Sequence, residues 1–233
     1  IIGDLDILCN APMHMIHSGI GDMIAKYISI CEWRYSRILT DEYYCPTIAA
    51  IVEEGLQRCV DSADGLLTRD PEAIRSVMEG MVLTGLAMQY TGISRPASGM
   101  EHYFSHIWDM RSLAFGTKAD LHGIQCGIGT LFSLKAYEYI KTIRPDKEKA
   151  LQYAAQFSLE DWNRQIRAHI GPGAEAMIEN EKKEQKYNKE EHARRLDMII
   201  ENWDEIMAVI NTLPDYETVY GLLKRIGAPV SVA

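Results

Sequence analysis

The sequence predicts an all-α protein, a multi-helix bundle, and three observations support this fold class. Apolar residues return at intervals of three and four along most of the chain, which is the period of an amphipathic helix. Stretches in which apolar and polar residues alternate are few. Of the 233 residues, 47% are hydrophobic and 24% are charged, a composition typical of a globular protein. We expect a single helical domain over residues 1–233.

The elements can be predicted in order along the chain. The opening residues IIGDLDIL are the only predicted strand, and we interpret them as the tail of a unit that lies upstream. The clearest helix starts at Pro71, because Asp70 can cap it and proline suits a first helical turn. Glycine and proline cluster at 92–99 and 171–173, which we interpret as loops. Further helices are predicted over 12–37, 47–64, 98–113, 121–142, 146–156, 158–168, 187–211 and 215–226.

Charge, hydropathy and cysteine content exclude several classes of partner. Basic residues number 24 and acidic residues 33, a net charge of −9, so a nucleic-acid partner is not expected. No apolar run approaches the roughly 18 residues of a membrane span. Five cysteines without regular spacing are typical of reduced thiols in a cytoplasmic protein. The charged stretch 179–197 is interpreted as a solvated helix face, and exposed helical faces in the last third can support a homo-oligomer.

Histidines and one carboxylate carry the candidate chemistry. In EHYFSH, His102 and His106 are four residues apart and share one face of a helix. His122 opens the next helix, in a glycine-rich segment that lets a backbone or a ligand approach closely. Asp22, in GIGD, lies in a mostly apolar helix, where a carboxylate is costly unless it is paired or bound to a cation. Lys26, one turn further on, is the alternative partner of this carboxylate.

Together these residues form a His/His/carboxylate set that can hold Zn, Fe or Ni with open positions for a substrate. Other common motifs do not appear: there is no P-loop, nucleophile elbow or HExxH, and the glycines of GIQCGIG follow no predicted strand. His14 and His17, three residues apart, either compete for a metal or serve helix packing. The residues alone therefore predict a helical domain with a metal site and leave the reaction open.

Three strings add a family resemblance. PMHMIHSGIGDMIAKY, SRPASGMEHYFSHIWDM and LHGIQCGIGTL resemble the helical, metal-binding domain of sn-glycerol-1-phosphate dehydrogenases, within the iron-containing alcohol dehydrogenase and dehydroquinate synthase-like superfamily. The resemblance covers roughly residues 1 to 140 and implies a dehydroquinate synthase-like helical domain. It implies that a divalent metal, Zn, Ni or Fe, is held by Asp22, His102 and His122.

The resemblance also implies roles for three further residues. His106 would lie beside the substrate oxygens and relay a proton. Lys26 and Arg95 are candidates for the substrate phosphate, although Arg95, just before Pro96, can instead pin its loop. The implied substrates are dihydroxyacetone phosphate and glycerol 1-phosphate, which are interconverted by hydride transfer with NAD(P).

The implied NAD(P) site belongs to an N-terminal nucleotide-binding domain that we expect to be absent from this chain. The sequence therefore does not decide whether these residues act as an enzyme on their own. Two alternatives remain. One is a non-catalytic helical interaction module that keeps the metal site, and the other is a metal-dependent lyase of the dehydroquinate synthase type.

Overall fold

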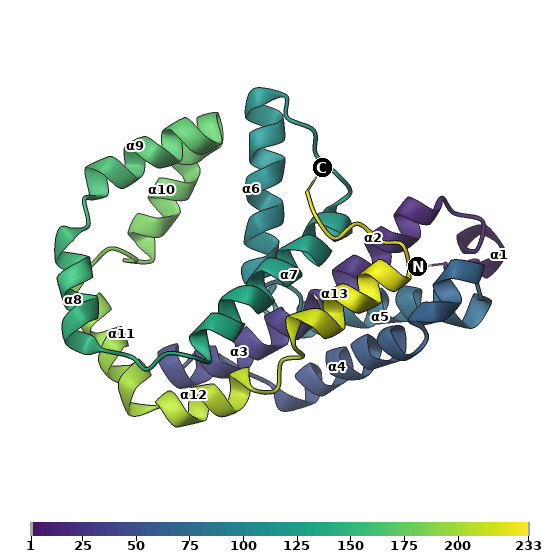
Figure 1. Ribbon diagram of the computed structural model, residues 1–233, viewed down its shortest axis with the longest axis horizontal. Helices are drawn as coiled ribbons and strands as arrows, with labels where there is room; N and C mark the ends of the chain where they lie inside the picture. Colours follow the sequence, from purple (N-terminus) through teal and green to yellow (C-terminus); the bar gives the residue numbers. More distant parts are fainter. Residues whose placement is uncertain (1, 233) are drawn as a thin grey trace.

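The all-α prediction is confirmed by the computed structural model, which describes residues 2–232. Over that range the chain forms α-helices and two short 3₁₀ segments, and no strand occurs among the described residues (Figure 1). The helices are α1 Leu5–Leu8, α2 Met13–Ile24, α3 Lys26–Thr40, α4 Pro46–Asp61, α5 Pro71–Thr91, α6 Met100–Phe115, α7 His122–Ile140, α8 Lys147–Gln156, α9 Leu159–Ile170, α10 Ala174–Lys183, α11 Lys189–Glu201, α12 Trp203–Ile210 and α13 Tyr216–Arg225; the 3₁₀ segments are Ala63–Thr68 and Gly171–Gly173.

The predicted N-terminal strand is wrong over the residues described, and its first residue lies outside them. The segment instead contains the single turn α1, because the Asp4 carboxylate accepts a hydrogen bond of 2.9 Å from the Asp6 amide and caps the turn. The stretch 171–173, predicted as a loop, is a 3₁₀ turn.

Two predicted helices are interrupted, and a third ends earlier than predicted. The helix predicted over 12–37 is divided at Ala25 into α2 and α3. The one predicted over 187–211 is divided at Asn202, whose side chain donates a hydrogen bond of 2.9 Å to the Met198 carbonyl. The one over 47–64 ends at Asp61, where the Ser62 hydroxyl donates to the Arg58 carbonyl. The charged stretch 179–197 is likewise not one helix, since Gln185 has a φ of 52° between α10 and α11.

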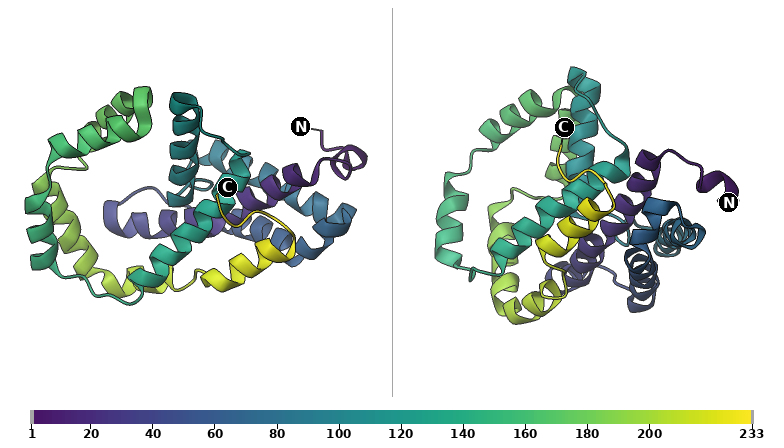
Figure 2. Two further views of the ribbon diagram at one scale, coloured as in Figure 1. Left: turned by 45° about the horizontal axis from the view of Figure 1, so that its top comes forward. Right: turned by 45° about the vertical axis from the view of Figure 1, so that its right-hand side comes forward.

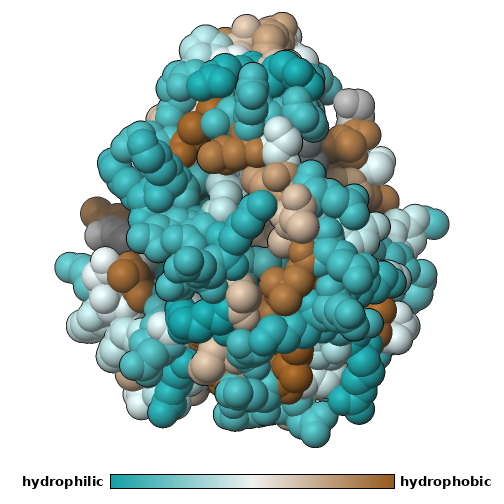
Figure 3. Space-filling model, turned by 90° about the vertical axis from the view of Figure 1, so that its left-hand side faces the viewer, coloured by the Kyte–Doolittle hydropathy of each residue, from teal (hydrophilic) through white to brown (hydrophobic). Residues whose placement is uncertain are grey.

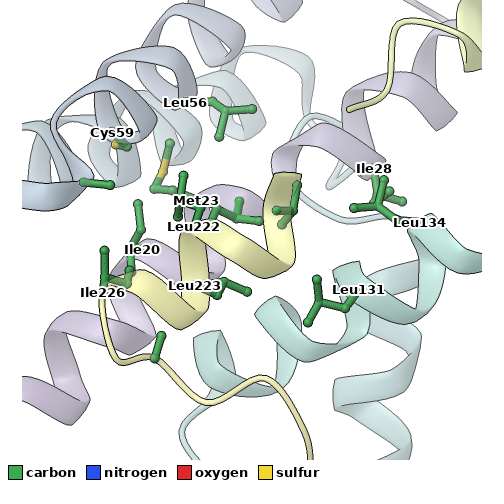
Figure 4. Packing of buried hydrophobic residues seen from close by; sticks show 14 of the residues in the cluster. Ile20, Met23, Ile28, Leu56, Cys59, Leu131, Leu134, Leu222, Leu223 and Ile226 are labelled. Atoms are coloured by element: carbon green, nitrogen blue, oxygen red, sulfur yellow. The ribbon is translucent and has the colours of Figure 1, made fainter. Parts of the chain in front are cut away.

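Helix α2 runs through the middle of the main hydrophobic core. It packs against α7 on one side and α5 on the other, and α4 packs against α5. Figure 4 shows the buried side chains that meet there, including Ile20 and Met23 from α2, Leu131 and Leu134 from α7, and Leu222 and Leu223 from α13. The core therefore joins segments from both ends of the chain around α2.

Glycines allow α2 and α7 to touch along their backbones. A Cβ atom added at Gly123 would lie 1.9 Å from the Ser18 carbonyl oxygen, and one added at Gly21 would lie 2.3 Å from the Gly123 carbonyl oxygen. Any larger side chain at either position would push the two helices apart. This contact brings Asp22, which follows Gly21, close to His122, which precedes Gly123.

Helices α8 to α11 form an arm that curves away from this core (Figures 1 and 2). Neither α8 nor α11 has a buried residue. The arm has its own small cluster of buried residues, Ile166, Ile170 and Ala174, and α9 packs against α6. The face of the molecule on the arm side is mostly hydrophilic, with scattered apolar side chains (Figure 3). Over residues 2–232 we find no helix with the length and apolarity needed to cross a bilayer.

Candidate metal centre

Three helices bring four potential ligand side chains to one place. Asp22 lies on α2, His102 in the first turn of α6, and His122 at the first position of α7, with Cys126 one turn further along α7. One ligand atom from each of the four lies within 4.8 Å of the others. The Asp22 Oδ1 atom is 3.7 Å from His102 Nε2 and 4.0 Å from His122 Nε2. The structure thus brings together Asp22, His102 and His122, as the motifs predicted.

The two oxygens of Asp22 have different surroundings. Oδ2 accepts a hydrogen bond of 3.1 Å from the Lys26 ammonium group, which also donates to the Ala97 carbonyl at 3.0 Å. The Lys26 side chain is only 1% exposed, so this ion pair is shielded from water. Asp22 therefore has the lysine partner that the sequence offered as an alternative, and its Oδ1 atom is left facing the two imidazoles.

A buried carboxylate orients His102. The Glu101 side chain is fully buried, and its Oε1 atom lies 2.7 Å from His102 Nδ1 and 2.9 Å from the Gly99 amide nitrogen. A carboxylate only accepts hydrogen bonds, so Nδ1 of His102 carries the proton. In the neutral ring, which is the form that binds metals, the lone pair is therefore on Nε2, the atom that faces Asp22.

A chain of hydrogen bonds orients His122, which, like His102, donates through Nδ1. The Gln125 amide nitrogen is 2.9 Å from each of two acceptors, Asp109 Oδ1 and the Asp120 carbonyl. Its carbonyl oxygen must then accept the Ser105 hydroxyl proton, at 2.9 Å. Ser105 Oγ, having donated to Gln125, accepts from His122 Nδ1 at 2.9 Å. The His122 lone pair is thus also on Nε2.

Two imidazole lone pairs and a carboxylate oxygen therefore point toward one another at distances too long for a hydrogen bond. The Cys126 thiol, 3.4 Å from His122 Nε2, can donate to that nitrogen in the metal-free protein. The other electron-rich atoms in this arrangement repel one another unless a proton or a metal cation lies between them. Two ligand atoms bound to a tetrahedral metal at about 2.0 Å are about 3.3 Å apart, slightly less than the separations seen here. Burial lowers the pKa of His122, and the nearby His102 lowers it further, which favours the neutral imidazole that binds metals.

Cys126 is the member of this cluster that sequence reasoning missed. Its Sγ atom is 3.4 Å from His122 Nε2, and burial, reinforced by the charge of Asp22, raises the pKa of its thiol to about 12. The available signal was its spacing, because residues 122 and 126 are four apart and share a helix face.

The other predicted histidines lie around or outside the cluster. His106 is exposed on α6, and its ring centre is 6.2 Å from that of His102 and 6.0 Å from that of His122. His14 bonds Asp120, and the buried His17 is 2.9 Å from the Ile226 carbonyl oxygen. His14 and His17 are therefore occupied elsewhere.

Arg95 is not brought to the cluster. Its Nε atom is 3.0 Å from a Glu42 carboxylate oxygen, and its guanidinium group also donates to the Ser36 hydroxyl. These contacts match the interpretation in which Arg95 pins its loop. A phosphate-binding role for Arg95, and for the paired and buried Lys26, stays a prediction.

The fold and this geometry define a class: an all-α protein in which three helices present two imidazoles, a carboxylate and a thiol to one point. No protein-family profile matches the chain. Among curated proteins, the chain is similar to one from Geobacillus stearothermophilus, with 37% identity over 134 residues, which are 58% of this chain and 33% of that protein. It is similar to one from Bacillus subtilis strain 168, with 33% identity over 183 residues, which are 74% of this chain and 46% of that protein. It is also similar to one from Methanosarcina mazei, with 35% identity over 134 residues, which are 58% of this chain and 36% of that protein. Each of these is named glycerol-1-phosphate dehydrogenase (NAD(P)+).

The chain is thus homologous to glycerol-1-phosphate dehydrogenases over the matched part, which confirms the resemblance predicted from its motifs. The matched part spans between a third and just under a half of the length of these relatives.

Proposed function

We propose that Asp22, His102 and His122 bind a divalent metal ion, Zn, Ni or Fe, and that residues 1–233 form a single domain on the substrate side of an NAD(P)-dependent glycerol-1-phosphate dehydrogenase. The observation that carries the proposal is the convergence of two imidazole Nε2 atoms on Asp22 Oδ1. The names of the relatives supply the substrate class and the nucleotide. In this proposal the nicotinamide is bound by a unit outside these helices.

When bound, the metal would polarise the ketone oxygen of dihydroxyacetone phosphate and favour hydride addition at the adjoining carbon. The residues around it have separate tasks. Lys26 holds one oxygen of Asp22, so that the other keeps its direction. Glu101 and Ser105 fix the tautomers of His102 and His122. The exposed His106 passes the proton between solvent and the substrate oxygen.

The metal content of the purified chain tests the first part of this proposal. The protein is freed of metal, loaded with excess zinc, desalted and measured by plasma mass spectrometry, alongside Asp22→Ala and His122→Ala. Asp64→Ala is the matched control, because Asp64 is an exposed carboxylate that pairs with Arg225 away from the cluster. Circular dichroism checks that each variant keeps its helices.

We expect about one ion per chain in the wild-type and control proteins and loss of that ion in the two ligand variants. A wild-type protein that retains no zinc, or ligand variants that retain as much as the control, would overturn the proposal.

Calorimetry with dihydroxyacetone phosphate on the zinc-loaded protein tests the substrate side. Arg95→Ala separates its two predicted roles when it is compared with Glu42→Ala. If Arg95 binds phosphate, only Arg95→Ala weakens substrate binding. If Arg95 pins the loop, both variants lower the unfolding temperature, and both bind the substrate with the affinity of the wild-type protein.

A further inference from the structure

We propose that Cys126 is a fourth ligand of this centre, binding the metal through its sulfur as a thiolate. The inference rests on the metal site proposed above and extends it from a His/His/carboxylate set to one that includes sulfur. It concerns the metal chemistry of this chain's own residues, and its test does not depend on catalysis.

The distances around Cys126 suit a shared metal ion. Its Sγ atom is 3.4 Å from His122 Nε2, and it belongs to the group of four ligand atoms that lie within 4.8 Å of one another. A nitrogen at about 2.0 Å and a sulfur at about 2.3 Å from a tetrahedral zinc ion are about 3.5 Å apart. The thiol and the imidazole therefore already have the separation of two ligands on one ion.

The thiol of Cys126 also differs from those of the other two buried cysteines. Cys31 and Cys59 each donate to a backbone carbonyl, of Val209 and Ser76 respectively. Both of those thiols are satisfied by the fold. The Cys126 thiol instead has His122 Nε2 as its hydrogen-bond partner, at 3.4 Å. This nitrogen is one that a metal would bind, so on metal binding both atoms would exchange this bond for bonds to the ion; the Cys126 side chain is fully buried and belongs to the cluster.

A sulfur ligand would change the charge and the metal preference of the centre. A thiol that coordinates a metal gives up its proton, here to solvent through the side of the cluster where His122 is 47% exposed. One carboxylate and one thiolate then balance the two positive charges of the ion, and a substrate oxygen would bind as a fifth ligand, a coordination number that zinc can reach. A thiolate favours zinc and similar soft or borderline ions over magnesium or manganese, which prefer oxygen ligands.

Cobalt provides a direct test, because a Co²⁺ ion bound to a thiolate absorbs in the near ultraviolet by charge transfer from sulfur. Wild-type protein, Cys126→Ser and Cys59→Ser are titrated with CoCl₂ under reducing conditions. Serine keeps the size and hydrogen-bonding capacity of the thiol but lacks the sulfur. Cys59→Ser is the matched control, since it removes a buried thiol outside the cluster.

We expect the near-ultraviolet band in the wild-type protein and in Cys59→Ser, and its loss in Cys126→Ser, which still shows the visible bands of bound cobalt. Visible cobalt bands without the near-ultraviolet band in the wild-type protein would overturn the sulfur ligand while leaving the metal site intact. Persistence of the near-ultraviolet band in Cys126→Ser would do the same. A wild-type protein that shows no cobalt bands at all would refute the metal site itself.

A second measurement needs no variant and guards against a Cys126→Ser protein that does not fold. X-ray absorption at the zinc edge of the unmodified, zinc-loaded protein should show one sulfur at about 2.3 Å from the metal. A first shell of nitrogen and oxygen only would contradict the proposal.

Discussion

Helices α2 and α7 touch along their backbones, whereas the arm from α8 to α11 is built with few buried side chains. A Cβ atom at Gly21 or Gly123 would clash with the opposite backbone, so the α2–α7 contact has a single possible spacing. In the arm, α8 and α11 bury no residue, and exposed ion pairs such as Arg167 with Glu175 link its helices.

The candidate metal ligands lie on the tightly packed side of this comparison. Ligand atoms that must keep their positions to within a few tenths of an ångström need helices that cannot shift. Segments with little buried apolar surface open locally at low cost in free energy. We therefore expect the centre to respond strongly to small changes at the α2–α7 contact and weakly to changes in the arm.

The largest effect is expected from Gly123→Ala. Its added methyl group would lie 1.9 Å from the Ser18 carbonyl oxygen, so α2 and α7 must separate. We expect a loss of about 3 kcal/mol or more in the free energy of unfolding, measured by urea denaturation, together with loss of metal binding. The control is Gly85→Ala in α5, where a Cβ atom meets nothing within 4 Å, and we expect a gain of about 0.5–1 kcal/mol there. Equal stability of the two variants would contradict the rigid contact.

A smaller effect is expected from the residues that orient the imidazoles. Ser105→Ala removes the hydroxyl that accepts the His122 Nδ1 proton, and Glu101→Gln weakens the acceptor beside His102. We expect each to lower zinc affinity by roughly 10- to 100-fold in a competition titration with a chelating dye. Ser112→Ala, on the same helix but outside these hydrogen bonds, should leave the affinity unchanged. If all three variants bind zinc alike, the oriented tautomers have no role in binding.

The buried Glu32 makes the packed region sensitive to pH. Burial, helped by the nearby charge of Glu101, raises the pKa of Glu32 to about 7 from its ordinary value of 4.5. The folded protein therefore binds more protons than the unfolded chain between these two values, and stability falls as the pH rises from 4.5 to 7.

Glu32→Gln should remove this part of the pH dependence. We expect its stability relative to the wild-type protein to rise between pH 4.5 and pH 7 by roughly 1–3 kcal/mol and to level off above pH 7, as measured by urea unfolding. A difference that is constant over this range would show that Glu32 does not titrate there.

The smallest effect is expected in the arm. Arg167→Ala breaks an ion pair with Glu175 in which both side chains are more than half exposed. Water and salt screen such pairs, so zinc affinity and the cobalt spectrum should not change. Hydrogen exchange should show α8 and α11 exchanging faster than α2 and α7 in both proteins. A metal site weakened by Arg167→Ala would mean that the arm supports the centre after all.

Much of the fold was predictable because apolar residues recur at helical spacing along several of the long helices. The helix from Pro71 is an example, with Asp70 capping its first turn as expected. Breaks in the helices were not predictable in the same way. Ala25 is a good helix former, so nothing local marks the boundary between α2 and α3; tertiary packing decides it.

The candidate ligands were predictable from motif order, and the groups that orient them were not. Glu101 precedes His102 directly, and neighbours in sequence do not share a helix face, so their hydrogen bond depends on where the helix begins. The chain from His122 to Gln125 passes through Ser105 on another helix, and only the folded structure brings these residues together.

The central claim, that two imidazoles present Nε2 lone pairs to Asp22 for a metal ion, can be tested by nitrogen-15 NMR of the histidine rings before and after zinc is added. We predict that His102 and His122 carry their proton on Nδ1 in the metal-free protein, and that both Nε2 resonances shift on addition of one equivalent of zinc, while His17 does not respond. Protons on Nε2 in the metal-free protein, or Nε2 resonances that zinc leaves in place, would contradict the account.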